Sequence, residues 1–298
     1  KIKNQNIKNG IDRDFNDQDL NKLIDSLPFK LTKDQDKVLE EILKDLKSKK
    51  RMNRLLQGDV GSGKTVISVL ALYANYLSGY QGALMVPTEI LANQHYDTVC
   101  SLLKDTDVKV KLLIGSLSKK EKDEIHKELK SGDIDIVIGT HALIQEDVDY
   151  ERLGLVITDE QHRFGVMQRT ILKDKGDTPD VLYMSATPIP RTYALTIYGD
   201  MDISVIKSLP SGRKPITTYL KSNTEIKDVL YMMYEELKND HQIYVIAPLI
   251  EESENLDLTT VNELKDKMEV AFGSKYNIGV VHGKLSNKDK DKIMNEFA

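Results

Sequence analysis

Short apolar runs alternate with longer amphipathic segments along most of this chain. Runs such as 83–86 and 181–184 have the length of buried strands, and polar residues follow them directly. Between the runs lie segments with apolar residues three or four positions apart, the spacing of a helix with one buried face. This alternation predicts an α/β fold, with a mainly parallel sheet covered by helices on both faces. The predicted strands lie at 55–56, 83–86, 108–112, 134–138, 155–157 and 181–184.

Capping residues mark the start of several predicted helices. Thr32 and Gln35 form a capping box, in which the two side chains satisfy backbone groups of the first turn, and Ser118 and Glu121 form another. Thr88 is expected to be the N-cap of a helix that runs to about residue 103. These signals place helices after 32, 88 and 118.

The alternation breaks at 209–215, where two prolines and a glycine lie close together. We expect a linker there, between a first domain at 27–208 and a second domain at 216–298. Residues 1–26 show no sustained period and are interpreted as a linker or the tail of a preceding domain. The second domain is expected to be truncated at its C-terminus, because three strands are half of a usual α/β domain. Its expected strands are 216–220, 243–247 and 278–281, and its expected helices are 225–237, 260–272 and one capped by Ser286.

Composition narrows the class of protein without identifying its chemistry. Of the 298 residues, 40% are hydrophobic and 30% are charged, as in an ordinary globular protein. Cys100 is the single cysteine, which excludes an internal disulfide and favours a reducing, cytoplasmic location. No apolar run has the length of a bilayer-spanning helix, so no membrane partner is expected. The net charge of −5 gives no support to a broad nucleic-acid-binding face, although local patches decide such contacts.

The strongest chemical signal follows the first predicted strand, where residues 58–65 read G-x-x-x-x-G-K-T. This is the pattern of a phosphate-binding loop. Glycines let backbone N–H groups curl around phosphate oxygens, and the N-terminus of the following helix favours an anion. Lys64 is expected to reach the β- and γ-phosphates of ATP, and Thr65 to bind Mg²⁺. The predicted ATP-binding residues of this loop are Gly58, Asp59, Val60, Gly61, Ser62, Gly63, Lys64 and Thr65.

Two adjacent acids, Asp159 and Glu160, follow the predicted strand at 155–157. A triphosphatase needs a carboxylate that holds Mg²⁺ and a group that orients the attacking water. We therefore expect Asp159 to hold Mg²⁺, mostly through water, and Glu160 to act as the base. Together with Lys64 they form the predicted catalytic set. His162 follows the acids closely enough to sense the γ-phosphate.

These motifs resemble those of the superfamily 2 helicases of the DExH type, in the same order along the chain. The loop at 58–65, the acidic segment at 159–162 and Ser185-Ala186-Thr187 resemble motifs I, II and III. Segments 87–89 and 139–143 resemble motifs Ia and Ib. The longer stretches 159–169, 185–202, 245–253 and 281–285 are similar to the branch-migrating bacterial DNA helicases of this superfamily. The resemblance covers roughly residues 27–298.

The resemblance implies two RecA-like P-loop domains and roles for further residues. Gln35 resembles the glutamine that reads adenine, with Phe29 beside it, although the interpretation of Gln35 as a capping residue alone stays open. His162, Ser185 and Thr187 would couple hydrolysis to movement. Thr88, Gly139 and Thr140 would contact the DNA backbone.

The implied function is that of an enzyme that uses ATP and Mg²⁺ to move on duplex DNA. It would act as a monomer on branched or duplex DNA, in branch migration of Holliday junctions and reversal of stalled forks during recombination and repair. A single-strand-binding protein would be a further contact. Two alternatives stay open. One is a duplex translocase of the transcription-repair coupling type, which shares the phosphate loop and Pro188-x-Pro190-Arg191. The other is a nucleotide-gated DNA-binding module without turnover.

Two parts of the helicase pattern are missing from the sequence. Nothing in it reads as a wedge domain of the oligonucleotide-binding type, and motifs V and VI, with their arginine finger, would follow residue 298. No arginine occurs after Arg213. We therefore expect the 298-residue chain to bind ATP with Mg²⁺ but to show almost no DNA-stimulated hydrolysis.

Overall fold

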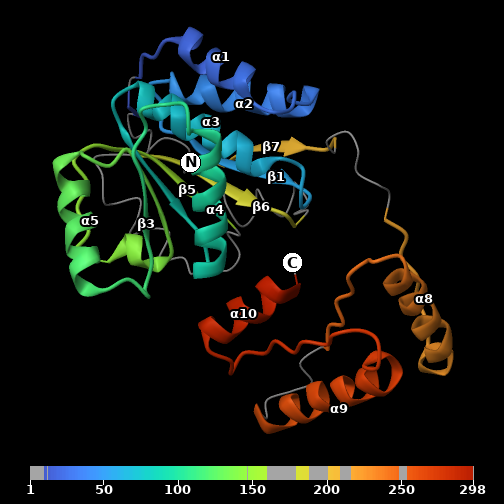
Figure 1. Ribbon diagram of the computed structural model, residues 1–298. Helices are drawn as coiled ribbons and strands as arrows, with labels where there is room; N and C mark the ends of the chain where they lie inside the picture. Colours follow the sequence, from blue (N-terminus) through green and yellow to red (C-terminus); the bar gives the residue numbers. More distant parts are fainter. Residues whose placement is uncertain are drawn as a thin grey trace, which may run out of the picture. The chain divides into compact units, whose positions relative to one another are not determined.

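The chain divides into two compact units, Lys1–Arg213 and Lys214–Ala298, in a computed structural model (Figure 1). The structure describes residues 10–11, 13–145, 147–159, 179–187, 201–208, 216–247 and 254–297. The predicted linker at 209–215 lies outside these residues. Among the helices described, none combines the length and the apolar character that a bilayer crossing requires.

The first unit is built on a seven-stranded sheet with the strand order β3-β4-β2-β5-β6-β1-β7. Every recorded strand pair is parallel, which confirms the predicted fold class for this unit. All six strands predicted in this region are present. The strands are β1 Asn53–Gly58, β2 Gln81–Met85, β3 Val110–Leu113, β4 Ile136–Gly139, β5 Leu153–Thr158, β6 Asp180–Ser185 and β7 Asp202–Ile206.

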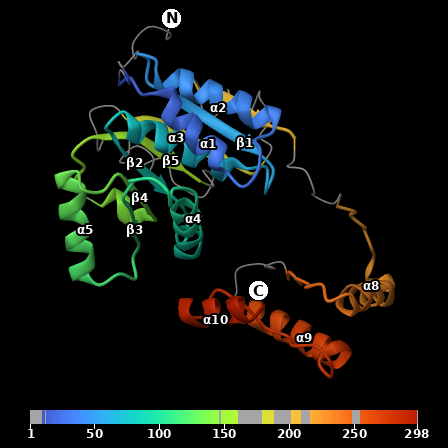
Figure 2. The same cartoon turned by 45° about the horizontal axis from the view of Figure 1, so that its top comes forward.

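The sheet is buried on both faces, which explains why its strands read as continuous apolar runs. In β1, for example, Leu56 belongs to one core cluster and Leu55 to the other. Figures 1 and 2 show α1, α2 and α3 side by side over one face, and α4 packs against the same core. On the opposite face, Ile125 and Leu129 of α5 join the second cluster with Leu143 of η1.

The helices of the first unit begin at the predicted capping residues. Thr32 and Gln35, and likewise Ser118 and Glu121, form complete capping boxes, and the Thr88 side chain accepts the N–H of Leu91. The helices are α1 Asp17–Ser26, α2 Lys33–Leu46, α3 Lys64–Leu77, α4 Glu89–Leu102, α5 Lys119–Ser131 and the short η1 His141–Ile144.

Part of the N-terminal segment belongs to the first unit, which corrects the interpretation of 1–26 as a linker or tail. In α1 the side chains of Leu20 and Leu23 are buried, and they lie in the same core cluster as α2 and α3. Ten residues are too few to show a clear helical period, so the apolar pattern of this segment does not predict the helix.

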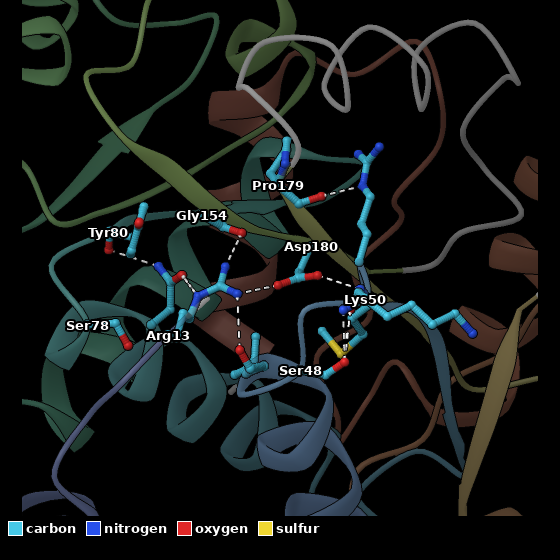
Figure 3. A network of polar contacts seen from close by, with 12 residues as sticks. Arg13, Ser48, Lys50, Ser78, Tyr80, Gly154, Pro179 and Asp180 are labelled. Atoms are coloured by element: carbon cyan, nitrogen blue, oxygen red, sulfur yellow. Dashed lines mark hydrogen bonds and ion pairs between the residues drawn. The ribbon is translucent and has the colours of Figure 1, made fainter. Parts of the chain in front are cut away.

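A buried arginine ahead of α1 connects this segment to the starts of three strands (Figure 3). The Arg13 guanidinium forms an ion pair with Asp180, and it donates to Asn75 Oδ1 at 3.1 Å and to the carbonyl of Gly154 at 2.5 Å. Asp180 also accepts the N–H of Met52. Because Asp180, Gly154 and Met52 stand at or beside the starts of β6, β5 and β1, Arg13 holds the amino edge of the sheet together.

The strand β7 was not predicted. Its residues alternate in burial, with Val205 40% exposed and Ile206 3% exposed, as befits a strand at the edge of the sheet. It pairs with β1 as far as Gly58, so it flanks the strand that leads into the phosphate loop.

The second unit has its predicted helices but, among its described residues, no strand. These helices are α8 Ile226–Lys238, preceded by η3 Asn223–Glu225, α9 Glu254–Phe272 and α10 Asn287–Phe297. The predicted strands at 216–220, 243–247 and 278–281 carry no strand pairing, and their side chains include Leu220 at 98% and Ile246 at 87% exposure. A strand exists only through hydrogen bonds to a neighbour, so an apolar run alone does not make one.

Candidate functional site

The phosphate loop connects β1 to α3, as the motif predicts. The loop turns through Gly61 and Gly63, whose φ angles are 75° and 89°, in the left-handed region that glycine adopts freely. A Cβ on Gly63 would also lie 2.1 Å from Nε2 of Gln35. Glycine is therefore required at 63 both by the backbone conformation and by the side chain packed against it.

Lys64 closes this loop from within. Its Nζ donates to the carbonyl oxygens of Gly58 at 2.7 Å and Asp59 at 3.0 Å. The Ser62 hydroxyl is buried and has no hydrogen-bond partner among the residues described. The loop thus presents an amine, a buried hydroxyl and the amino end of α3, a set of donors suited to phosphate oxygens.

Gln35 lies against the phosphate loop, and both the oxygen and the nitrogen of its side-chain amide form hydrogen bonds. Its Oε1 accepts the N–H of Thr32 at 2.8 Å, and its Nε2 donates to the carbonyl of Ser62 at 2.8 Å. The capping interpretation of Gln35 is therefore confirmed, and the side chain also supports the phosphate loop. Recognition of adenine by Gln35 stays a prediction, as does the role of Phe29, whose ring is 48% exposed.

Asp159 follows β5 at the same edge of the sheet. Its N–H donates to the carbonyl of Met85 at 2.9 Å, and Oδ2 lies 3.0 Å from Nε2 of His95, on α4. No motif in the sequence singles out His95. Its only signal was its spacing, seven residues after Thr88 and so two turns along the same helix. The predicted base Glu160 and the predicted coupling residue His162 lie outside the described residues.

Ser185 and Thr187 lie at the end of β6, beside the strand that enters the phosphate loop. Their hydroxyls are 2.9 Å apart, and the Thr187 N–H donates to Ser185 Oγ at 3.2 Å. Gln57, which pairs with Ser185 across the two strands, donates from Nε2 to the Thr187 carbonyl at 2.9 Å. The strand that enters motif I is thus joined to motif III by a side-chain hydrogen bond that the sequence did not predict.

Thr88 follows β2, and Gly139 and Thr140 lie at the end of the neighbouring strand β4, of which Gly139 is the last residue. Val86 donates its N–H to the Gly139 carbonyl at 2.9 Å, which holds the two strand ends together. A Cβ on Gly139 would lie 2.1 Å from the Leu113 carbonyl oxygen, so no other residue fits there. Thr140 is only 2% exposed. This figure is for the whole residue, backbone included, so contact of Thr140 with DNA stays a prediction.

Every predicted site residue that the structure describes, apart from Phe29 and Gln35, therefore lies at the carboxyl edge of one sheet or in the loops that follow it. Ligands bind at this edge in parallel α/β sheets. Among the described residues there is no cluster of three or more His, Cys, Asp or Glu side chains. A cation here would rely on few protein oxygens together with phosphate and water, which is how Mg²⁺ binds nucleotides. Thr65 and Asp159 offer hydroxyl and carboxylate oxygens of that kind, so the residues fit Mg²⁺.

Comparison with known proteins defines the class to which this site belongs. The sequence profile of the DEAD/DEAH box helicase family matches residues 32–196, more than half of the chain. The chain belongs to this family. Within it, the chain is similar to the ATP-dependent DNA helicase RecG of Bacillus subtilis (strain 168), with 53% identity over 289 residues. A RecG of Aquifex aeolicus (strain VF5) is 51% identical over 280 residues.

A solved structure of RecG bound to a three-way DNA junction superimposes with a TM-score of 0.81 at 43% identity, covering 97% of this chain and 38% of that one. Dbp5 of S. cerevisiae bound to RNA and ADP BeF3 superimposes with a TM-score of 0.66 at 20% identity over 93% of this chain and 70% of that one, a likeness of fold alone. These matches confirm the RecA-like helicase fold and the predicted resemblance to RecG. The alignments cover 97% and 93% of this chain, but only 42% of the Bacillus subtilis relative and 35% of the Aquifex aeolicus one.

Proposed function

We propose that this chain is the ATP-binding core of a DNA helicase that remodels branched DNA. The observation that carries the proposal is the closed phosphate loop, with Lys64 held at its centre by the carbonyls of Gly58 and Asp59. The relatives named RecG, at about half identity over nearly the whole chain, support the choice of branched DNA over other nucleic acids. A cytoplasmic location, as a monomer, agrees with this role and with the single cysteine.

In the proposed site, ATP places its phosphates in the loop formed by residues 58–65. Lys64 binds the β- and γ-phosphates, and Thr65 and Asp159 hold Mg²⁺, which when bound neutralises the charge on the phosphate oxygens. Glu160 orients the attacking water and accepts its proton. Ser185 and Thr187, tied to the loop through Gln57, pass the state of the nucleotide to the rest of the protein together with His162.

The proposed DNA contacts lie at the ends of β2 and β4, in Thr88, Gly139 and Thr140. Backbone N–H groups and the amino end of α4 bind phosphates, and such contacts do not distinguish one base sequence from another. The affinity for DNA should therefore fall steeply as the salt concentration rises. Base-specific binding, or binding that does not respond to salt, would contradict this part of the proposal.

The proposal is tested in a protein that contains this chain and has the full length of the RecG relatives. ATP turnover is measured on forked, single-stranded and blunt duplex DNA of equal length. We expect forked DNA to stimulate turnover most, whereas equal stimulation by blunt duplex would favour a translocase of the transcription-repair coupling type. Glu160→Gln should bind ATP with Mg²⁺ yet turn over about 10²–10⁴-fold more slowly. Turnover within a few-fold of the parent would show that Glu160 is not the base.

A nucleotide-gated binding module is a second candidate for the 298-residue chain itself. The observation that favours it is the absence of arginine from residues 214–298, since an arginine delivered to the γ-phosphate is worth about 10³–10⁵ in rate. The lysines of this segment lack the planar fork of a guanidinium. We expect the 298-residue chain to bind ATP with Mg²⁺ but to show almost no DNA-stimulated turnover. Robust turnover by this chain alone would overturn the candidate.

A further inference from the structure

The candidate site contains a histidine to which none of the proposed steps gives a task. His95 is 8% exposed and lies on α4 between the buried residues Ala92 and Val99. Its Nε2 lies 3.0 Å from Oδ2 of Asp159. Its other ring nitrogen, Nδ1, is buried and has no hydrogen-bond partner among the residues described.

The bonding partners of His95 assign its proton. An ionised carboxylate only accepts hydrogen bonds, so the nitrogen that faces Asp159 must carry the hydrogen. A neutral imidazole then leaves Nδ1 as the bare nitrogen, in agreement with its lack of an acceptor. His95 therefore acts as a hydrogen-bond donor aimed at one oxygen of Asp159.

This hydrogen bond supplements the one that holds the backbone of Asp159. The N–H of Asp159 bonds the carbonyl of Met85, the last residue of β2, and this fixes where the side chain starts. The bond from His95 then fixes the direction in which the carboxylate points. A carboxylate held at both its backbone and its Oδ2 has little freedom to turn away from a metal ion.

We propose that His95 is a positioning residue that orients the Mg²⁺ ligand Asp159. This inference rests on the proposed function, in which Asp159 and Thr65 hold the metal. Loss of such an outer hydrogen bond weakens metal binding by about 10–100-fold. Because α4 begins after its N-cap Thr88, the same rigid helix also carries a proposed DNA contact.

The test measures how much Mg²⁺ strengthens the binding of a fluorescent, non-hydrolysable ATP analogue to the 298-residue chain. The ratio of the two dissociation constants, without and with Mg²⁺, gives the metal-dependent gain. His95→Gln keeps an amide nitrogen near the position of Nε2, and it should keep the gain. His95→Asn places its amide near Nδ1 instead, out of reach of Oδ2, and it should reduce the gain about 10–100-fold. Affinity without Mg²⁺ should be unchanged in both variants.

His126→Asn is the matched control. Its Nδ1 lies 3.5 Å from a carboxylate oxygen of Asp147, and its Nε2 is also buried without a partner among the described residues. His126 lies on α5, whose apolar residues pack on the opposite face of the sheet, so its replacement should leave the gain intact. Thermal unfolding of each variant is recorded alongside.

Asp159→Asn separates failure of this inference from failure of the proposed function. If Asp159→Asn keeps the full gain, Asp159 does not hold the metal and both proposals fall. If Asp159→Asn loses the gain but His95→Asn keeps it, the inference about His95 alone is overturned. It is also overturned if His95→Asn weakens binding equally with and without Mg²⁺, because that pattern indicates a structural role only.

Discussion

The two edges of the same sheet treat their buried polar groups in opposite ways. At the amino edge, Arg13 and Asp180 bond each other, and Asn75 and the N–H of Met52 complete the network (Figure 3). At the carboxyl edge, several buried atoms have no partner among the described residues: Ser62 Oγ, Thr140 Oγ1, Thr158 Oγ1 and His95 Nδ1. Asn53 Oδ1, at the start of β1, is an exception at the amino edge.

This difference indicates that the amino edge of the sheet contributes mainly to stability and the carboxyl edge mainly to function. A buried polar group that is hydrogen-bonded within the protein stabilises the folded state, and removing its partner leaves that group unpaired at a cost in stability. A buried polar group left unpaired in a fold calls for an explanation, such as strain, a catalytic role or a bound ion or water. We therefore expect variants at the amino edge to change the free energy of unfolding, and variants at the carboxyl edge to change ligand binding.

The largest effect is expected from Lys64→Ala at the carboxyl edge. This change removes the only cation of the phosphate loop and should abolish ATP binding, because no other group in the loop can replace a point charge among phosphates. The free energy of unfolding should change by less than about 2 kcal/mol, since the Lys64 bonds to the Gly58 and Asp59 carbonyls lie in a partly exposed loop. Calorimetric titration with ATP and urea unfolding measure the two quantities. ATP binding at the parental affinity would contradict the site assignment.

The next largest effect is expected from Arg13→Met at the amino edge. Removing one member of a buried ion pair leaves Asp180 without its buried partner and should lower the free energy of unfolding by about 3–5 kcal/mol. The affinity of the folded protein for ATP should be unchanged. Arg152→Met is the matched control. Both guanidiniums lie over the Tyr80 ring, that of Arg13 5.5 Å and that of Arg152 4.6 Å from its centroid, but Arg152 is exposed. Its replacement should change the free energy of unfolding by about 1 kcal/mol or less.

The loss in Arg13→Met should also depend on pH. Burial raises the pKa of Asp180, and the guanidinium of Arg13 opposes that rise. Without Arg13 the pKa rises further. When the pKa of a carboxyl is higher in the folded state than in the unfolded state, the group stabilises the fold at pH values below its unfolded-state pKa, near 4. This stabilisation is lost as the pH rises through the folded-state pKa. The deficit relative to the parent should therefore shrink as pH falls. An equal deficit at pH 5 and pH 8 would show that lost packing, rather than an unpaired charge, is responsible.

The smallest effect is expected from Asp34→Asn. Asp34 lies at the carboxyl edge, but its carboxylate is hydrogen-bonded to groups of the protein itself. Asp34 accepts the N–H groups of Ser208 at 2.7 Å and Lys207 at 3.0 Å, after the end of β7. The bond from Ser208 is the main reason why the pKa of Asp34 is lowered. A lowered pKa gives stability above the unfolded value that is lost as pH falls through the folded value, so parent and variant should converge in acid.

Hydrogen exchange at the amides of Lys207 and Ser208 measures this effect directly. In Asp34→Asn both amides should exchange faster at neutral pH, while ATP affinity stays the same. Reduced ATP affinity with unchanged exchange would mean that Asp34 acts on the ligand, which would break the distinction between satisfied and unsatisfied groups at this edge.

Features that depend on neighbours along the chain could be predicted from the sequence. The glycines of the phosphate loop, the capping boxes at Thr32 and Ser118 and the apolar strands of the first unit all take their conformation from residues within a few positions. Such signals gave the fold class and most of the candidate site. In 216–298 the same signals predicted helices, which are present, and strands, which the described residues do not form, because a helix satisfies its own hydrogen bonds and a strand needs a partner.

Features that depend on residues far apart were decided by the tertiary structure. Arg13 meets Asp180 across 167 positions of sequence, and His95 meets Asp159 across 64. Nothing near Arg13 indicates that it will be buried. Likewise, nothing near His95 indicates that α4 will pack beside the acid that follows β5, three strands further along the chain. Strand order and register create these pairs, because only the packed sheet brings the starts of β1, β5 and β6 together at one edge and their ends at the other.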